Sequence, residues 1–83
     1  MTDLMELLYE YTQDRRFAGF LDRRAYEAAG RMEEKNLTAL KAGLSSERLE
    51  ALGRYQDACK ERHAMELEAM FQAAFSVARE LHP

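Results

Sequence analysis

The only proline of this 83-residue chain is its last residue, so no internal proline forces a helix to stop. Residues that favour strands are scarce: the sequence has no isoleucine, one valine and three threonines, against thirteen alanines. β-Branched side chains lose rotamer freedom in a helix and fill strands, whereas alanine has the highest helix propensity. The sequence therefore predicts an all-α fold in a single domain, 1–83.

Two capping signals mark helix starts in the first half of the chain. Asp3 followed by Glu6 resembles a capping box and predicts a short helix over 3–12. One face of this helix is expected to carry Leu4, Leu7, Leu8 and Tyr11. Asp22 is a second capping residue and predicts a helix over 22–42. The chain should therefore begin with a short N-terminal helix and continue into a longer one.

Between these helices, residues 12–22 are mostly polar and include Gly19, so we expect the first arm to be broken there. Gly43 is expected to adopt the left-handed conformation that often ends a helix. Ser45 then caps a third helix over 46–82, which would be about 55 Å long at 1.5 Å per residue.

The third predicted helix carries one continuous row of residues, here called the seam, at steps of three and four. Its steps follow an eleven-residue repeat, 3.67 residues per turn, which keeps such a row nearly straight. A second apolar stripe, including Phe71 and Phe75, widens this face towards the C-terminus. The seam consists of Leu52, Tyr55, Cys59, His63, Glu66, Met70, Ala74, Val77 and Leu81.

A reversal at residues 43–45 would fold the first arm back on the long helix, with Ala29 near Cys59 and residues 4–11 near 70–81. The seam then predicts a helical hairpin with more apolar surface than one neighbour can cover. Hydrophobic burial is the main term that opposes chain entropy, so we expect a homodimer, coiled-coil-like, that forms a helical bundle.

Cys59, His63 and Glu66 lie at positions i, i+4 and i+7 and share one helix face. Thiolate, imidazole and carboxylate are zinc ligands. The helical signatures His-Glu-x-x-His and Glu-x-x-His are absent, because Lys60 stands where the second would place its glutamate. We interpret the three residues as a polar layer of the seam, keep them as metal-ligand candidates, and expect no metal, cofactor or catalytic residue.

Residues 15–24, RRFAGFLDRR, form a basic segment with one acidic residue. Arginine with aromatic residues is the composition that single-stranded nucleic acid favours. We favour the alternative that the phenylalanines close the bundle while the arginines pair with nearby carboxylates. The candidate interaction residues are Arg15, Arg16, Phe17, Phe20, Arg23 and Arg24.

The ends of the hairpin carry an acidic surface. A helical face of this kind can dock into a basic groove of another protein and block nucleic acid. It therefore predicts an inhibitor of a nucleic-acid enzyme as one form of interaction protein. Its residues are Asp3, Glu6, Glu10, Asp14, Glu66, Glu68 and Glu80.

LMELLYEY, residues 4–11, resembles the opening Leu-x-x-Leu-Tyr pattern of a family of short, uncharacterised helical-hairpin proteins from Gram-positive bacteria, their phages and mobile elements. FQAAFSVARELH, residues 71–82, is similar to the family's closing Phe-x-x-Gly-Phe-x-Leu-x-x-x-Leu run, with Ala74 at the glycine and Val77 at the first leucine. The resemblance implies a helical hairpin and a phage or mobile-element origin, and it supplies no catalytic residues.

Cellular location is predicted by three features of the sequence. Cys59 is the only cysteine, the first residues lack a basic leader, and no apolar run approaches the roughly 18 residues of a membrane span. We expect a cytoplasmic location and no membrane partner.

Together these features predict a non-enzymatic protein–protein interaction protein, directed as an inhibitor at a host nucleic-acid enzyme or defence system. The alternative is a nucleic-acid-associated regulator that binds through the basic segment.

Overall fold

The computed structural model describes residues 1–82, and every regular element within them is helical. The all-α prediction is confirmed, including the short N-terminal helix and the long C-terminal one. The elements are α1 (Asp3–Tyr11), the π-helical turn η1 (Thr12–Arg16), the 3₁₀ turn η2 (Phe17–Phe20), α2 (Arg23–Ala42) and α3 (Ser46–Leu81).

Two of the three predicted N-caps are confirmed by side-chain hydrogen bonds. The Asp22 carboxylate accepts from the backbone N–H of Ala25 at 3.1 Å, at the start of α2. The Ser45 hydroxyl oxygen accepts from the N–H of Arg48 at 3.3 Å, at the start of α3. Each bond satisfies a donor that the first helical turn leaves unpaired, so both helix starts follow from local sequence.

The predicted cap of α1 is wrong by one residue. Thr2, and not Asp3, accepts from the N–H of Met5, with a distance of 3.2 Å to its hydroxyl oxygen. Asp3 and Glu6 lie in the first turn instead. Carboxylates there interact favourably with the positive end of the helix dipole, so both residues still favour a helix start.

The end of α2 also differs from the expectation. Gly43 has φ −100° and ψ 6°, so it is not left-handed. The N–H groups of Gly43 and Leu44 donate to the carbonyls of Leu40 and Lys41, at 3.4 and 3.2 Å. These bonds tighten the last turn and satisfy its carbonyls without positive φ.

The connector between α1 and α2 remains helical for longer than expected. The chain does not leave the helix near Thr12, because η1 and η2 carry helical turns on to Phe20. It breaks at Leu21, whose φ of −81° and ψ of 136° are extended. The first arm is therefore broken at residues 21–22, at the end of the predicted interval.

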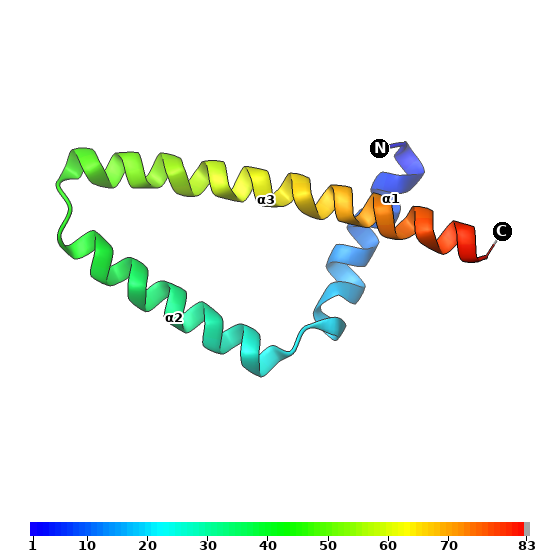
Figure 1. Cartoon of the computed structure of the whole chain (residues 1–83), viewed down its shortest axis with the longest axis horizontal. Helices are drawn as coiled ribbons and strands as arrows, with labels where there is room; N and C mark the ends of the chain where they lie inside the picture. Colours follow the sequence, from blue (N-terminus) through cyan, green and yellow to red (C-terminus); the bar gives the residue numbers. More distant parts are fainter. Residues whose placement is uncertain (83) are drawn as a thin grey trace.

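The elements form an open triangle of 56 × 29 × 18 Å (Figure 1). α2 and α3 meet at the turn and then diverge, while α1 crosses α3 in its C-terminal half and the connector forms the third side. The expected packing of Ala29 near Cys59 is therefore wrong within one chain. The connector holds the start of α2 away from α3, and apolar periodicity alone could not reveal that angle.

No residue within 1–82 is buried. A compact monomer of 9.6 kDa exposes about 5,100 Å² by the scaling of surface with mass, whereas this chain exposes 7721 Å². The excess is roughly 2,600 Å². Large apolar side chains are among the exposed ones, for example Phe20 at 89% and Leu81 at 71%. The helices therefore present faces that this chain does not cover.

Within residues 1–82, none of the helices combines the length and the apolar character that a membrane crossing needs.

Candidate interaction surface

The seam is largely open to solvent in its C-terminal half. Met70, Val77 and Leu81 are 68, 54 and 71% exposed, and Tyr55, His63 and Ala74 are exposed as well. Leu52 and Cys59, closer to the turn, are half-buried. One continuous helix thus presents a long row that no other part of residues 1–82 encloses.

The second stripe of α3 is the one that α1 covers. The ring of Tyr9 lies edge-on to the ring of Phe71, with centroids 5.3 Å apart, and Phe71 stacks on Phe75 at 6.4 Å. Leu67, Phe71 and Phe75 are half-buried. Because α1 occupies this side of α3, the adjacent seam remains uncovered.

A different face of α1 makes this contact than the sequence predicts. The expected face was Leu4, Leu7, Leu8 and Tyr11, but of these only Leu8 is half-buried. Met5, Tyr9 and Thr12 are the other half-buried residues of this region. Both faces of α1 carry apolar residues, so periodicity did not distinguish them. The aromatic residue Tyr9 on one face of α1, together with Phe71 on the second stripe of α3, was the feature of the sequence that could have identified the contacting face.

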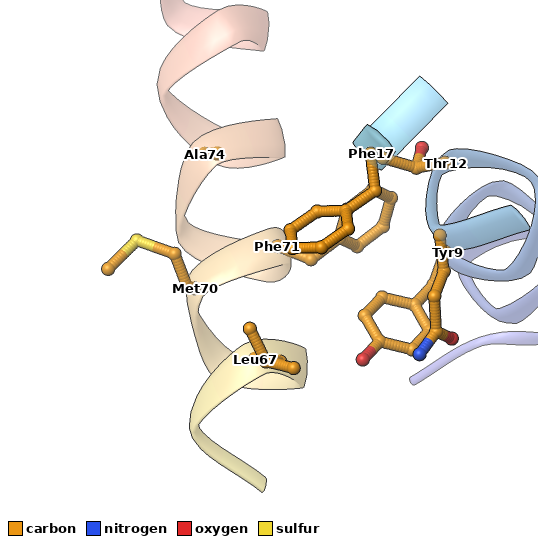
Figure 2. Close-up of a pocket in the computed structure, with 8 residues that line it drawn as sticks. Tyr9, Thr12, Phe17, Leu67, Met70, Phe71 and Ala74 are labelled. Carbon is orange, nitrogen blue, oxygen red and sulfur yellow. The ribbon is translucent and has the colours of Figure 1, made fainter. Parts of the chain in front are cut away.

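A groove of about 270 Å³ lies beside the crossing of α1 and α3 (Figure 2). Figure 2 shows Tyr9 and Phe17 facing Phe71 across it. The groove connects two predicted surfaces, since the seam contributes Met70 and Ala74 and the basic segment contributes Phe17. Its other lining residues are Thr12, Gln13 and Leu67.

The three metal-ligand candidates lie along one face but do not converge. His63 Nδ1 is 3.9 Å from Glu66 Oε2, and Arg62 Nε is 3.7 Å from Glu66 Oε1. Cys59 is half-buried one turn away. Within residues 1–82 no three His, Cys, Asp or Glu side chains gather so as to hold a metal ion.

Cys59 interacts instead with its neighbour one turn earlier. A side-chain hydrogen bond with Cys59 raises the pKa of the Tyr55 phenol above its ordinary value. A Coulombic interaction with Cys59 adds to this rise in the pKa of Tyr55, and the positive charge of Arg62 opposes it in part. The phenol of Tyr55 and the thiol of Cys59 are therefore neighbours along the seam.

The basic segment lies open on the surface. The two ion pairs formed within residues 1–82 are those of Glu66, so none of its arginines pairs with a carboxylate of that part of the chain. Arg16 lies over the ring of Tyr11, 5.9 Å from its centroid. Phe20 is 89% exposed. The expectation that phenylalanines close the bundle while arginines pair with nearby acids is thus wrong within one chain, although Phe17 lines the groove.

The acidic surface is exposed at every predicted residue, on α1 and η1 as well as on α3. Only Glu66 among them takes part in an ion pair of the described chain. Four of these carboxylates lie in the residues that precede Arg15, so an acidic stretch of sequence directly adjoins the basic segment.

Comparisons with protein-family models, with curated proteins and with solved structures find no match to this chain. The resemblance of residues 4–11 and 71–82 to a phage-associated family thus stays a prediction.

Proposed function

We propose that this chain is a non-enzymatic, cytoplasmic interaction protein that docks its exposed apolar surface against another protein. One observation carries the proposal: no residue within 1–82 is buried, while large apolar side chains stand exposed on every helix. Contiguous apolar surface of this extent is typical of interaction sites.

The seam and the adjoining groove supply the docking surface. Met70 and Ala74 belong to both, so a partner on the seam also reaches the apolar groove beside α1. Burial of this apolar surface, at about 25 cal/mol per Å², is the main favourable contribution to the free energy of binding that so open a chain can obtain. Docking and folding are thus expected to stabilise each other.

The geometry around Cys59 and His63 supports a non-enzymatic role. Both residues lie in the middle of α3, where backbone amides are engaged in helical hydrogen bonds. An activated nucleophile needs free donors beside it to stabilise the developing negative charge. The interior of a continuous helix supplies none.

The acidic surface favours a basic partner. Exposed carboxylates on α1 and at the C-terminal end of α3 complement a positively charged groove, such as that of a nucleic-acid enzyme. In its most specific form, the proposal is that the chain inhibits such a host enzyme and is encoded by a phage or mobile element. This form is supported by the resemblance of residues 4–11 and 71–82 to motifs of a phage-associated family.

Affinity capture with matched variants tests the proposal. The tagged chain is compared with a variant carrying Met70→Glu and Val77→Glu, which places charge on the seam. Met65→Glu is the control, since Met65 is 65% exposed but lies off the seam. Proteins retained by the native chain and the control but lost by the seam variant support the proposal. Equal capture by all three contradicts it.

A second candidate function is nucleic-acid binding through the basic segment. It is favoured by four arginines that have no carboxylate partner within residues 1–82 and by the exposed ring of Phe20 beside them. Guanidinium groups bind phosphates, and an exposed aromatic ring stacks on a base.

Binding to a labelled single-stranded oligonucleotide tests this candidate. Four phosphate contacts predict that log K falls with log salt at a slope of about −3. Replacing Arg15, Arg16, Arg23 and Arg24 with glutamine should abolish binding. The control removes equal charge elsewhere, from Arg31, Lys35, Lys41 and Arg54. Equal loss in both variants would show that only net charge matters and would contradict a specific segment.

A further inference from the structure

The part of the α3 seam from Leu52 to Val77 is symmetric about its centre. From Leu52 to Val77 its steps are 3, 4, 4, 3, 4, 4 and 3, which read the same in both directions. The centre falls between His63 and Glu66. The midpoint of Ser46–Leu81 lies within about one residue of the same point, at equal rise per residue.

We propose that α3 pairs antiparallel with α3 of a second copy of this chain, about a two-fold axis between His63 and Glu66. Such an axis brings the same surface of both copies together. It sets each seam residue from Leu52 to Val77 opposite another of them, while Leu81 falls opposite Arg48. A small side chain faces a large one in two of the three apolar pairs. The apolar pairs are Leu52 with Val77, Tyr55 with Ala74, and Cys59 with Met70.

Charge favours this direction of pairing over the parallel one. In the antiparallel pair His63 of each copy faces Glu66 of the other, twice by symmetry. A parallel, in-register pair would set Glu66 against Glu66 at the centre. At the helix ends the antiparallel register also places Arg48 beside Glu80. Opposite charges across an interface select orientation and register.

The structure leaves the seam accessible to a second copy. α1 covers the neighbouring stripe at Phe71, while Met70 and Val77 stay exposed. The eleven-residue repeat keeps the seam nearly straight, so two such helices can follow each other over their length.

The exposed area fits a second copy as the occupant. The excess of roughly 2,600 Å² per chain over a compact monomer is of the order that obligate dimers bury, about 1,000–2,500 Å² per partner. The inference rests on the proposed function and deepens it, since it names a second copy of this chain as the protein that docks on the seam. The acidic residues of α1 stay exposed in each copy for a further partner.

Disulfide trapping tests the register. Met70→Cys adds a thiol that the antiparallel pair places opposite Cys59 of the second copy. Within one chain these positions lie eleven residues, about 16 Å, apart along the helix, too far for a disulfide. For the same reason Cys59 cannot reach Cys59 of the second copy in this register. The controls are the native chain, Met70→Cys with Cys59→Ser, and Met65→Cys.

The chains are oxidised at micromolar concentration and separated on a non-reducing gel, and light scattering gives the native mass. We expect a mass of twice 9.6 kDa for the native chain. We also expect Met70→Cys to be mostly disulfide-linked dimer, with the three controls at background.

Three results would overturn the proposal. A linked dimer of the native chain would show parallel pairing at Cys59, and equal linkage in Met65→Cys would show random collision. A folded monomer by light scattering would exclude a second copy as the occupant. Capture of another protein that depends on the seam would then still support the proposed function, so the two failures are distinguishable.

Discussion

The ring of Tyr9 on α1 stands edge-on to the ring of Phe71 on α3, with centroids 5.3 Å apart and planes at 73°. Edge-to-face pairs contribute about 0.5–1.5 kcal/mol beyond the area they bury. This pair joins the two ends of the chain, since α1 begins at Asp3 and α3 ends at Leu81.

Phe71→Ala should release α1 from α3. We expect a loss of about 1–2 kcal/mol in the free energy of unfolding, less than for a fully buried phenylalanine, because Phe71 is only half-buried. Hydrogen exchange of residues 3–11 should become faster. Tyr9→Phe keeps the ring and should leave the exchange unchanged. Unaltered protection of α1 in Phe71→Ala would mean that the aromatic pair does not hold the crossing.

Gly53→Ala should stabilise α3. Gly53 lies inside the helix, and an added Cβ would meet nothing within 4 Å. Replacing glycine with alanine inside a helix yields about 0.5–1 kcal/mol, which thermal unfolding followed by circular dichroism can measure. A lower midpoint would instead indicate that another molecule approaches the backbone closely at Gly53.

His63→Glu should weaken the proposed antiparallel pair, because it sets two carboxylates against each other at both symmetric positions. We expect the dimer dissociation constant to rise roughly five- to thirty-fold, which corresponds to about 1–2 kcal/mol. Adding Glu66→Lys restores opposite charges and should recover most of the affinity. Sedimentation at graded concentrations measures both constants. Failure of the double variant to recover would argue against this register.

The Tyr55 phenol should ionise at higher pH than an ordinary tyrosine, because Cys59 raises its pKa. The folded chain then holds the phenolic proton more tightly than the unfolded chain. This contribution to stability is fully present below the ordinary tyrosine pKa of about 10 and is lost as pH rises through the raised value.

Tyrosinate absorbance, recorded as the difference between the native chain and Tyr55→Phe, measures that pKa. Cys59→Ala should bring it back towards the ordinary value. A difference titration that is the same with and without Cys59 would show that the thiol is not the cause.

Local signals predicted most of the helix starts, for reasons that individual residues make plain. Asp22 stands alone before its helical run, so only one cap is available there, and the structure uses it. Ser45 and Ser46 are adjacent before α3, and the predicted residue, Ser45, is the one that caps the helix. At the N-terminus Thr2 and Asp3 are adjacent and both can cap. The sequence pattern of Asp3 with Glu6 favoured the wrong one.

Arrangement in space was predicted less well. Periodicity identified the apolar seam of α3, but it does not say which molecule covers that seam, and in the structure α2 diverges from α3 (Figure 1). The groove at Tyr9 was missed for a related reason. α1 has apolar residues on two adjacent faces, and only the crossing with Phe71 selects one of them.

A chain whose residues 1–82 include none that is buried has no interior to lose. Under the proposed docking, its folded fraction would depend on how much partner surrounds it, since ligands that bind only the folded state stabilise it in proportion to the logarithm of their concentration. Dilution would then act as a denaturant, and the abundance of the protein in the cell would govern its lifetime against proteolysis.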